Sequence, residues 1–206
     1  MDIKKTSNLL LNFTIKRVAE ILGFAIFVAG TLLLIALITY SPEDPNFIFP
    51  ENSEIKNLLG FQGSFISDLL FQSVGIISYL ISFTLILTGI NIFRFKEFFL
   101  IIENIFFAII YCVFGTLFFS YFYTNAFTLY INGNGGFVGN YFNQTFLNSL
   151  VQIHELISFY ILIFLTFCIF LISINFNLIK FYKIFLKIFK FLFKREEKNY
   201  TDKSEV

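Results

Sequence analysis

The chain has too few charged residues for a soluble globular protein. Of its 206 residues, 14% are charged and 57% are hydrophobic, whereas a soluble domain carries about 25% charged residues. Because so little charge cannot coat a globular surface, lipid must replace water over much of the molecule. The scarcity therefore excludes an ordinary soluble domain and indicates a membrane protein.

Residues that hold metals or break helices are also scarce. The chain contains a single histidine, His154, and two cysteines, Cys112 and Cys168, which lie in apolar runs without metal-ligand spacing. We expect both cysteines to be packing residues, and we expect no metal and no cofactor. The only prolines are Pro42, Pro45 and Pro50, so the apolar runs contain no residue that must kink a helix.

The motifs of nucleotide-binding and catalytic proteins are missing. The sequence has no Walker A pattern, and its glycines at 133, 135, 136 and 139 do not follow GxGxxG. No serine–histidine–acid, cysteine–histidine or paired-carboxylate set can be assembled from the apolar runs. We therefore expect no catalytic residues and no ATP binding, with an enzyme site around Ser64, Asp68 and His154 as a weaker alternative.

Four apolar runs are each long enough to cross a bilayer, which takes about 20 helical residues. The first is longer than the apolar part of a cleavable signal peptide, so we interpret it as a retained signal anchor. The sequence predicts an all-α fold, a polytopic membrane bundle with four transmembrane helices at 21–40, 69–93, 98–123 and 156–174.

The positive charges predict the orientation of these spans. Of the 15 Lys and Arg residues, only Lys56 lies in a stretch that the alternation places outside. By the positive-inside rule, both ends of the chain face the cytoplasm, including the N-terminal stretch 1–20. The polar stretches 41–68 and 124–155 then form two outer loops, and 131–139 is expected to be a turn or small hairpin.

Polar and small residues suggest how the helices begin and pack. Asp68 is expected to cap the second span, since a helix N-terminus favours an anion. Glu103 is expected to snorkel or to pair with Lys96 or Arg94. Small residues recur at helical spacing and predict contacts between spans; they are Gly75, Ser78, Ser82 and Gly89 on the second span, and Ala108, Cys112, Thr116 and Ser120 on the third.

The tail after the fourth span carries a regular basic pattern. Lysines recur at alternating spacings of three and four, so they share one helical face; they are Lys180, Lys183, Lys187, Lys190 and Lys194. Residues 176–195 are thus predicted to form a basic amphipathic helix on an anionic inner leaflet. Nucleic acid is a weaker alternative partner, because the aromatic residues opposite the lysines need an apolar surface. Residues 196–206 are expected to be disordered.

Three patches stand at defined positions relative to the spans: Tyr40-Ser-Pro-Glu-Asp-Pro45 after the first span, residues 57–75 leading into the second, and Asn134-Gly-Gly-Phe-Val-Gly139 in the second outer loop. Together they resemble the N-terminal four-span membrane domain of FtsK/SpoIIIE-type DNA translocases. The entry to the first span, with Arg17, Glu20 and Gly23, is also similar. The resemblance covers about residues 15–175.

The resemblance implies a non-catalytic inner-membrane anchor at the bacterial division septum, which contacts other division proteins and tethers a cytoplasmic DNA-pumping motor. The motor's own motifs are not in this sequence, so the chain is expected to be a fragment, a split gene product or a free-standing anchor. Homo-oligomers are a further expectation, and a small transporter or channel component is the alternative. The candidate contact residues are Tyr40, Pro42, Asp44, Pro45, Gly60, Gly63 and Asp68 in the first outer loop, with Gly135, Gly136 and Gly139 in the outer turn.

Overall fold

The structure, a computed structural model, describes residues 3–45, 54–124 and 132–192. All regular structure in these ranges is helical, which confirms the all-α prediction. The elements are α1 (Ile3–Ile38), α2 (Gly60–Val74), the 3₁₀ turn η1 (Gly75–Ile77), α3 (Ser78–Phe95), α4 (Phe99–Phe122), α5 (Gly136–Asn143), α6 (Phe146–Ile153), α7 (Glu155–Ser173) and α8 (Leu178–Leu192).

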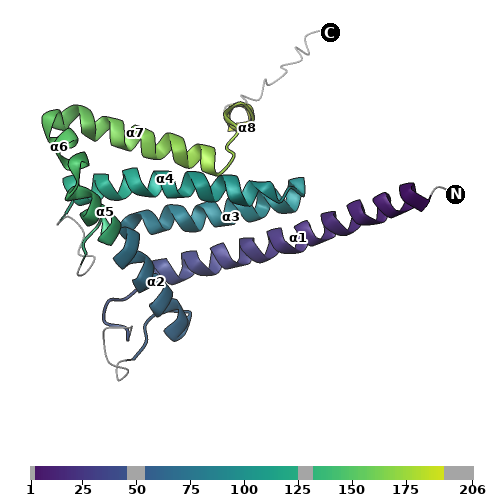
Figure 1. Cartoon of the computed structure of the whole chain (residues 1–206), viewed down its shortest axis with the longest axis horizontal. Helices are drawn as coiled ribbons and strands as arrows, with labels where there is room; N and C mark the ends of the chain where they lie inside the picture. The colour runs from purple at the N-terminus through teal and green to yellow at the C-terminus, as the bar shows by residue number, and fades with distance from the viewer. Residues whose placement is uncertain (1–2, 46–53, 125–131, 193–206) are drawn as a thin grey trace, which may run out of the picture. The chain divides into compact units, whose positions relative to one another are not determined.

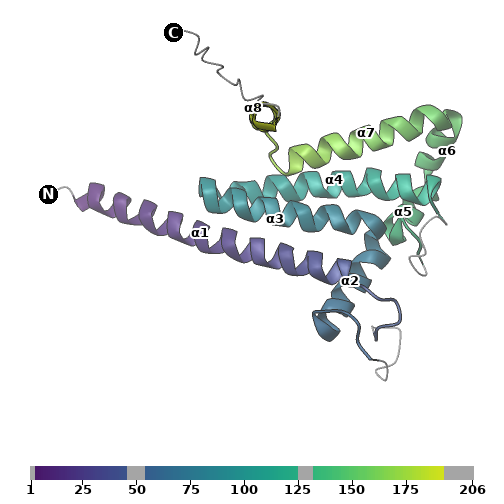
Figure 2. The ribbon, with the colours of Figure 1, turned by 180° about the vertical axis from the view of Figure 1, so that it is seen from behind.

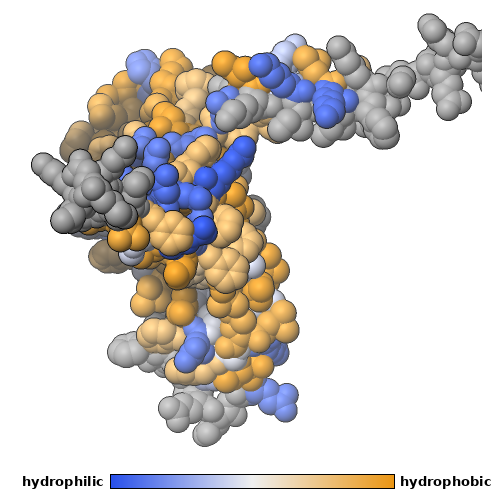
Figure 3. Space-filling view, turned by 90° about the vertical axis from the view of Figure 1, so that its right-hand side faces the viewer, coloured by the Kyte–Doolittle hydropathy of each residue, from blue (hydrophilic) through white to orange (hydrophobic). Residues whose placement is uncertain are grey.

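Four helical stretches are long and apolar enough to cross a membrane, as the sequence predicted. They are Leu10–Ile38, Gly60–Phe95, Phe99–Phe122 and Glu155–Ser173. The first helix is much longer than the predicted span 21–40, because its helical pattern continues through the N-terminal stretch. Hydrophobic residues cover most of the coloured face seen in Figure 3, and the hydrophilic residues gather mainly in its upper part.

The described residues up to Asn175 form one compact unit, and α8 belongs to a second. Within the first unit, α1, α3, α4 and α7 lie alongside one another in that order, each antiparallel to the next (Figure 1). One end of this bundle carries α2, α5, α6 and the loops around them; we call it the loop end. The short turn between α3 and α4 lies at the opposite end, where Lys96 has a left-handed backbone with φ of 63°. Which end faces the cytoplasm stays a prediction from the charges.

Glycines bring α1 and α3 into backbone contact. A Cβ atom added to Gly23 would lie 2.5 Å from the backbone nitrogen of Phe93, and one on Gly30 would lie 2.7 Å from that of Ile86. A Cβ on Gly89 would overlap the backbone of Phe27 in return. In lipid, where apolar side chains gain little by leaving their solvent, such close packing holds helices together. The predicted packing role of Gly89 is confirmed, and its partner is α1.

The second span is broken, which the sequence did not predict. Gly75 has φ of +60° and ψ of −141°, a conformation open almost only to glycine. The chain passes through η1 and continues as α3, while α2 turns away from the axis of α3 (Figure 2). The prediction that Asp68 caps a helix is wrong: α2 begins at Gly60, and Asp68 lies within it.

Of the two forms expected for 131–139, the described residues show the turn and not the hairpin. Ile131 lies outside them, and the chain from Asn132 makes a turn that leads directly into α5 at Gly136. Helix α6 follows after Thr145, whose hydroxyl accepts a hydrogen bond from the N–H of Leu147 and so caps the helix. Val151 of α6 packs with Leu117 and Phe118 of α4 and Leu162 of α7 in a buried cluster.

The predicted tail helix is present as α8. Lys183 and Lys187 are exposed along it, as are Phe181, Phe185 and Phe189. Lys180 and Lys190 lie in the helix, and Lys194 and the predicted disordered tail 196–206 fall outside the described residues. Contact of this helix with anionic lipid stays a prediction.

Candidate functional site

The first loop folds around the buried side chain of Asp44, which is 1% exposed. Its carboxylate accepts hydrogen bonds from the backbone N–H groups of Lys56, over 2.8 Å, and Asn57, over 2.9 Å. Hydrogen bonds to a carboxylate are stronger than neutral ones. Asp44 therefore ties together the two stretches of chain that flank residues 46–53.

Asn57 fastens this loop to the end of α1. Its side-chain amide donates to the carbonyl oxygen of Ala36 over 2.9 Å, and its own oxygen accepts from the N–H of Leu59 over 3.0 Å. The carbonyl groups in the last turn of a helix have no partner within the helix, and Asn57 supplies one. A Cβ on Gly63 would overlap the amide of Asn57, so glycine is required where α2 crosses it.

An aromatic group joins three helices at the same place. The hydroxyl of Tyr40 donates to the carboxylate of Asp68 over 2.8 Å, and its ring lies 4.8 Å from that of Phe71. Phe71 in turn packs against Tyr79, at 5.5 Å, and the hydroxyl of Tyr79 donates to the carbonyl of Leu37. Asp68 is thus a buried acceptor that fixes α2 against the end of α1.

One ion pair lies on the exposed side of this loop. The ammonium of Lys56 is 2.5 Å from the carboxylate of Glu43, and both side chains are largely exposed. The hydrogen bond from Lys56 lowers the pKa of Glu43 below its ordinary value of 4.5. The same bond raises the pKa of Lys56 above 10.5.

The second loop packs onto the break in the second span. The carbonyl oxygen of Asn134 accepts a hydrogen bond from the N–H of Ile76 over 3.0 Å. Asn134 is fully buried, and its side chain donates to the carbonyl of Tyr123. Gly135 packs so closely on α4 that a Cβ there would lie 2.6 Å from the carbonyl oxygen of Thr116. Glycine is needed at position 135 because the backbone of the loop lies directly against the backbone of α4.

The remaining glycines of the turn are equally constrained. Gly136 has φ of +63°, and a Cβ on it would lie 2.6 Å from the backbone nitrogen of Gly75. One on Gly139 would overlap the carbonyl of Thr116. Asn132 and Asn140 complete the contact, since Asn132 donates to the carbonyl of Gln72, and Asn140 donates to the carbonyl of Asn132.

The three sequence patches that carry the family resemblance therefore meet in space. Asp44 and Tyr40 of the first patch bind Asn57 and Asp68 of the second, and Gly75 at the end of the second patch contacts Asn134 of the third. We call the assembly of residues 39–45, 54–79 and 132–140 the loop-end unit.

The structure gives the predicted contact residues two different roles. Those with buried positions shape the unit from inside: Asp44, Pro45, Gly63, Asp68, Gly135, Gly136 and Gly139. Tyr40, Pro42 and Gly60 are partly exposed, and contact with a partner protein stays a prediction for them. Sequence reasoning missed Asn57 and Phe71, whose importance depends on contacts distant in sequence.

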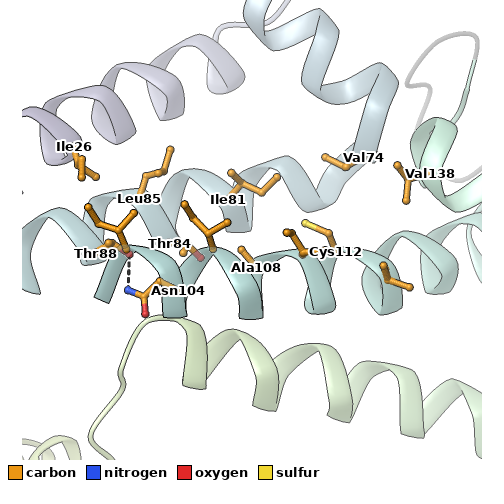
Figure 4. A pocket seen from close by; sticks show the side chains of 14 residues that line it. Ile26, Val74, Ile81, Thr84, Leu85, Thr88, Asn104, Ala108, Cys112 and Val138 are labelled. Carbon is orange, nitrogen blue, oxygen red and sulfur yellow. Dashed lines mark hydrogen bonds between the residues drawn. The ribbon is translucent and has the colours of Figure 1, made fainter. Parts of the chain in front are cut away.

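Several polar side chains that lie between the spanning helices are bound to one another. The amide of Asn104 donates to the hydroxyl of Thr88 over 2.7 Å, and its oxygen accepts from the amide of Asn175 over 2.8 Å. Thr84 and Tyr111 pair over 3.0 Å. Thr84, Thr88 and Asn104 border a cavity of about 550 Å³ between α1, α3 and α4, whose other lining residues are apolar apart from Cys112 (Figure 4).

The end opposite the loops carries an ion-paired group. Glu20 of α1 binds Arg17 at 2.6 Å and Lys96, which ends α3, at 2.7 Å. Of the alternatives expected for Glu103, pairing with Lys96 is wrong, because Lys96 binds Glu20 of α1 instead. Glu103 is exposed, and snorkelling or pairing with Arg94 stays a prediction. Arg17, Glu20 and Gly23, which carry part of the family resemblance, all lie on the stretch of α1 that meets the end of α3.

Known proteins with similar sequences share one description. The model of the four-transmembrane region of DNA translocase FtsK/SpoIIIE matches residues 15–186. Curated relatives named DNA translocase FtsK are 25% identical over 84% of this chain in Rickettsia typhi and 28% identical over 84% in Rickettsia bellii. The relative from Azospirillum brasilense is 35% identical over 37% of the chain.

These matches cover only part of the relatives. The chain spans 22% of the length of each of the two Rickettsia proteins and matches 12% of the Azospirillum protein. No solved structure matches. With four apolar helices of spanning length, this is a multi-pass protein of the inner membrane, and the chain belongs to the FtsK/SpoIIIE family through its four-span membrane region.

Proposed function

We propose that the chain is a non-catalytic membrane anchor that places a DNA-translocating motor at the bacterial division septum. The observation that carries the proposal is the convergence of the three family patches in the loop-end unit. Residues needed only to span a bilayer would not have to build a hydrogen-bonded structure outside the spans. A folded surface of this kind fits recognition by another protein.

The interior of the bundle supports an anchor better than a transporter. The polar groups around the cavity of Figure 4 are satisfied by one another, as Thr88 is by Asn104 and Thr84 by Tyr111. Transport paths through membranes instead use polar or ionisable groups that face a water-filled route. At the end opposite the loops, α3 and α4 are joined by a very short turn between Phe95 and Phe99, which leaves no room for a domain inserted between these two helices.

The proposed partners differ at the two faces of the membrane. Other division proteins bind the exposed part of the loop-end unit, where Glu43, Glu54 and Lys56 reach solvent. The lysine face of α8 contacts the anionic inner leaflet. ATP and DNA bind the motor rather than this chain, in keeping with the restriction of the matches to the membrane region.

A C-terminal fluorescent fusion in dividing cells tests this proposal. We expect a band at midcell, and fluorescence from a fluorophore that matures in the cytoplasm also reports a cytoplasmic C-terminus. An even peripheral signal would contradict the septal role. Flux of ions or solutes through liposomes that contain the purified chain would contradict the anchor in favour of a transporter.

A further inference from the structure

Helix α2 has its polar and apolar faces reversed relative to a helix on the surface of a soluble protein. Its small and polar residues Gly63, Ser64, Ser67 and Asp68 are buried against the rest of the loop-end unit. Phe71 is buried within the loop-end unit, but three other large apolar residues point away from the protein: Phe61 is 49% exposed, Ile66 46% and Leu69 51%. Leu58, just before the helix, is 74% exposed. An apolar outward face requires an apolar surrounding.

The second span is longer than the hydrocarbon core is thick, which bears on where the outward face of α2 lies. The stretch Gly60–Phe95 has 36 residues, which would rise about 54 Å as one helix, whereas the hydrocarbon core is about 30 Å thick. The 18 residues of α3 alone rise about 27 Å. Helix α3 alone is therefore nearly long enough to cross the hydrocarbon core, and α2 is not needed for the span. The break at Gly75 turns α2 out of line with α3 (Figure 2).

The charge on α2 favours lipid as its surrounding. The only charged residue in Gly60–Val74 is Asp68, which is 6% exposed and accepts the hydrogen bond of Tyr40. The outward face, which also carries the exposed but uncharged Gln62, therefore has no charge that would need water. Helix α6, which also lies at the loop end, repeats the pattern, with Phe146, Leu150 and Ile153 exposed at spacings of four and three, while Val151 faces the protein.

We infer that α2 lies in the plane of the membrane, with Leu58, Phe61, Ile66 and Leu69 inserted among the lipid chains of the leaflet at the loop end. In this position the helix lies between the lipid and the buried side chains of Asp44, Asn57 and Asp68, and it keeps water from their hydrogen bonds. The first loop is held at the membrane surface rather than projecting into solvent.

Single cysteines test this placement in the full chain, with Cys112 and Cys168 replaced by alanine. The variants Phe61→Cys and Leu69→Cys report on the outward face of α2, and Glu54→Cys, which is exposed in the polar loop, is the matched control. An apolar surrounding raises the pKa of a thiol, and one pKa unit removes about tenfold of the reactive thiolate. We therefore expect a membrane-impermeant maleimide to label positions 61 and 69 at least about tenfold more slowly than position 54, in liposomes of zwitterionic lipid.

A second measurement distinguishes lipid from protein cover. A fluorophore at position 61 is expected to be quenched by lipids with a nitroxide on the upper acyl chain, and one at position 54 is not. Labelling of 61 and 69 as fast as 54, in both liposomes and cells, would overturn the inference. Fast labelling in liposomes with protection in cells would also overturn it, because a partner protein rather than lipid would then cover the face.

Discussion

Gly75 lies so close to the carbonyl group of Asn134 that any side chain on Gly75 would overlap it. The adjacent N–H, of Ile76, donates a hydrogen bond to that same carbonyl over 3.0 Å. The break in the second span and the turn of the second loop therefore depend on each other. Gly75 leaves room for the carbonyl of Asn134, and that carbonyl accepts the hydrogen bond from the N–H of Ile76.

Replacing Gly75 with alanine is expected to destabilise the loop-end unit strongly. The new side chain would strain the backbone at φ of +60° by about 1–3 kcal/mol and would also displace Asn134. The matched control is Gly60→Ala, where φ is +65° but no atom lies within 4 Å of the added carbon. Thermal unfolding in detergent should show the larger loss for Gly75→Ala; equal losses would mean that the contact with Asn134 contributes nothing.

The hydrogen bond between Tyr40 and Asp68 is expected to contribute measurably to stability. Tyr40→Phe keeps the ring against Phe71 but leaves a buried carboxylate without its donor, at a cost of about 1–3 kcal/mol. A double-mutant cycle with Asp68→Leu should give a coupling of at least about 0.5 kcal/mol, as for residues in contact. Unfolding by denaturing detergent measures it, and additive effects of the two substitutions would contradict the bond.

The pair of Glu43 and Lys56 predicts a dependence on pH in two windows. Because the pKa of Glu43 is lowered from 4.5, its contribution is present above that pH and is lost as the pH falls through the lowered value. Because the pKa of Lys56 is raised from 10.5, its contribution is present below that pH and is lost as the pH rises through the raised value. An NMR titration of the Glu43 carboxyl should move towards 4.5 in Lys56→Gln; an unchanged titration would show that the pair does not form.

At the end of the bundle opposite the loops, the side chain of Asn104 is expected to contribute more to stability against unfolding than any one of its partners. It binds Thr88 and Asn175 through its side chain, and its carbonyl accepts from Ser173. Asn104→Ala removes both side-chain hydrogen bonds, and each such bond in a membrane bundle is worth about 0.6–1.7 kcal/mol. Thr88→Val, which removes one partner with little change in shape, should cost less in the same unfolding measurement. A larger loss for Thr88→Val would contradict the network.

The sequence alone was enough to predict features that depend on local pattern. Uninterrupted apolar runs located the four spans, and the glycine at position 89 marked a helix contact because its spacing placed it on one face with other small residues. The lysine spacing likewise predicted α8. These features follow from composition and the period of a helix, and they need no knowledge of distant contacts.

The loop-end unit could not be predicted in the same way. Asp68 has the sequence context of a helix cap, and only the position of Tyr40, far away along the chain, makes it a buried acceptor. Gly75 was one member of a small-residue stripe, and nothing nearby showed that its φ would be positive. Asn134 was visible within a turn motif, but its burial depends on the break that Gly75 creates.

The most direct test of the central claim compares midcell enrichment of the intact chain with that of Asn134→Ala, both as C-terminal fluorescent fusions at equal membrane abundance. Asn134→Ala removes the side-chain hydrogen bond to Tyr123 but leaves all four spans in place. We expect a midcell band for the intact chain and an even peripheral signal for the variant. Equal midcell enrichment of the two would show that recruitment does not depend on the loop-end unit, and absence of a band for the intact chain would contradict the septal anchor itself.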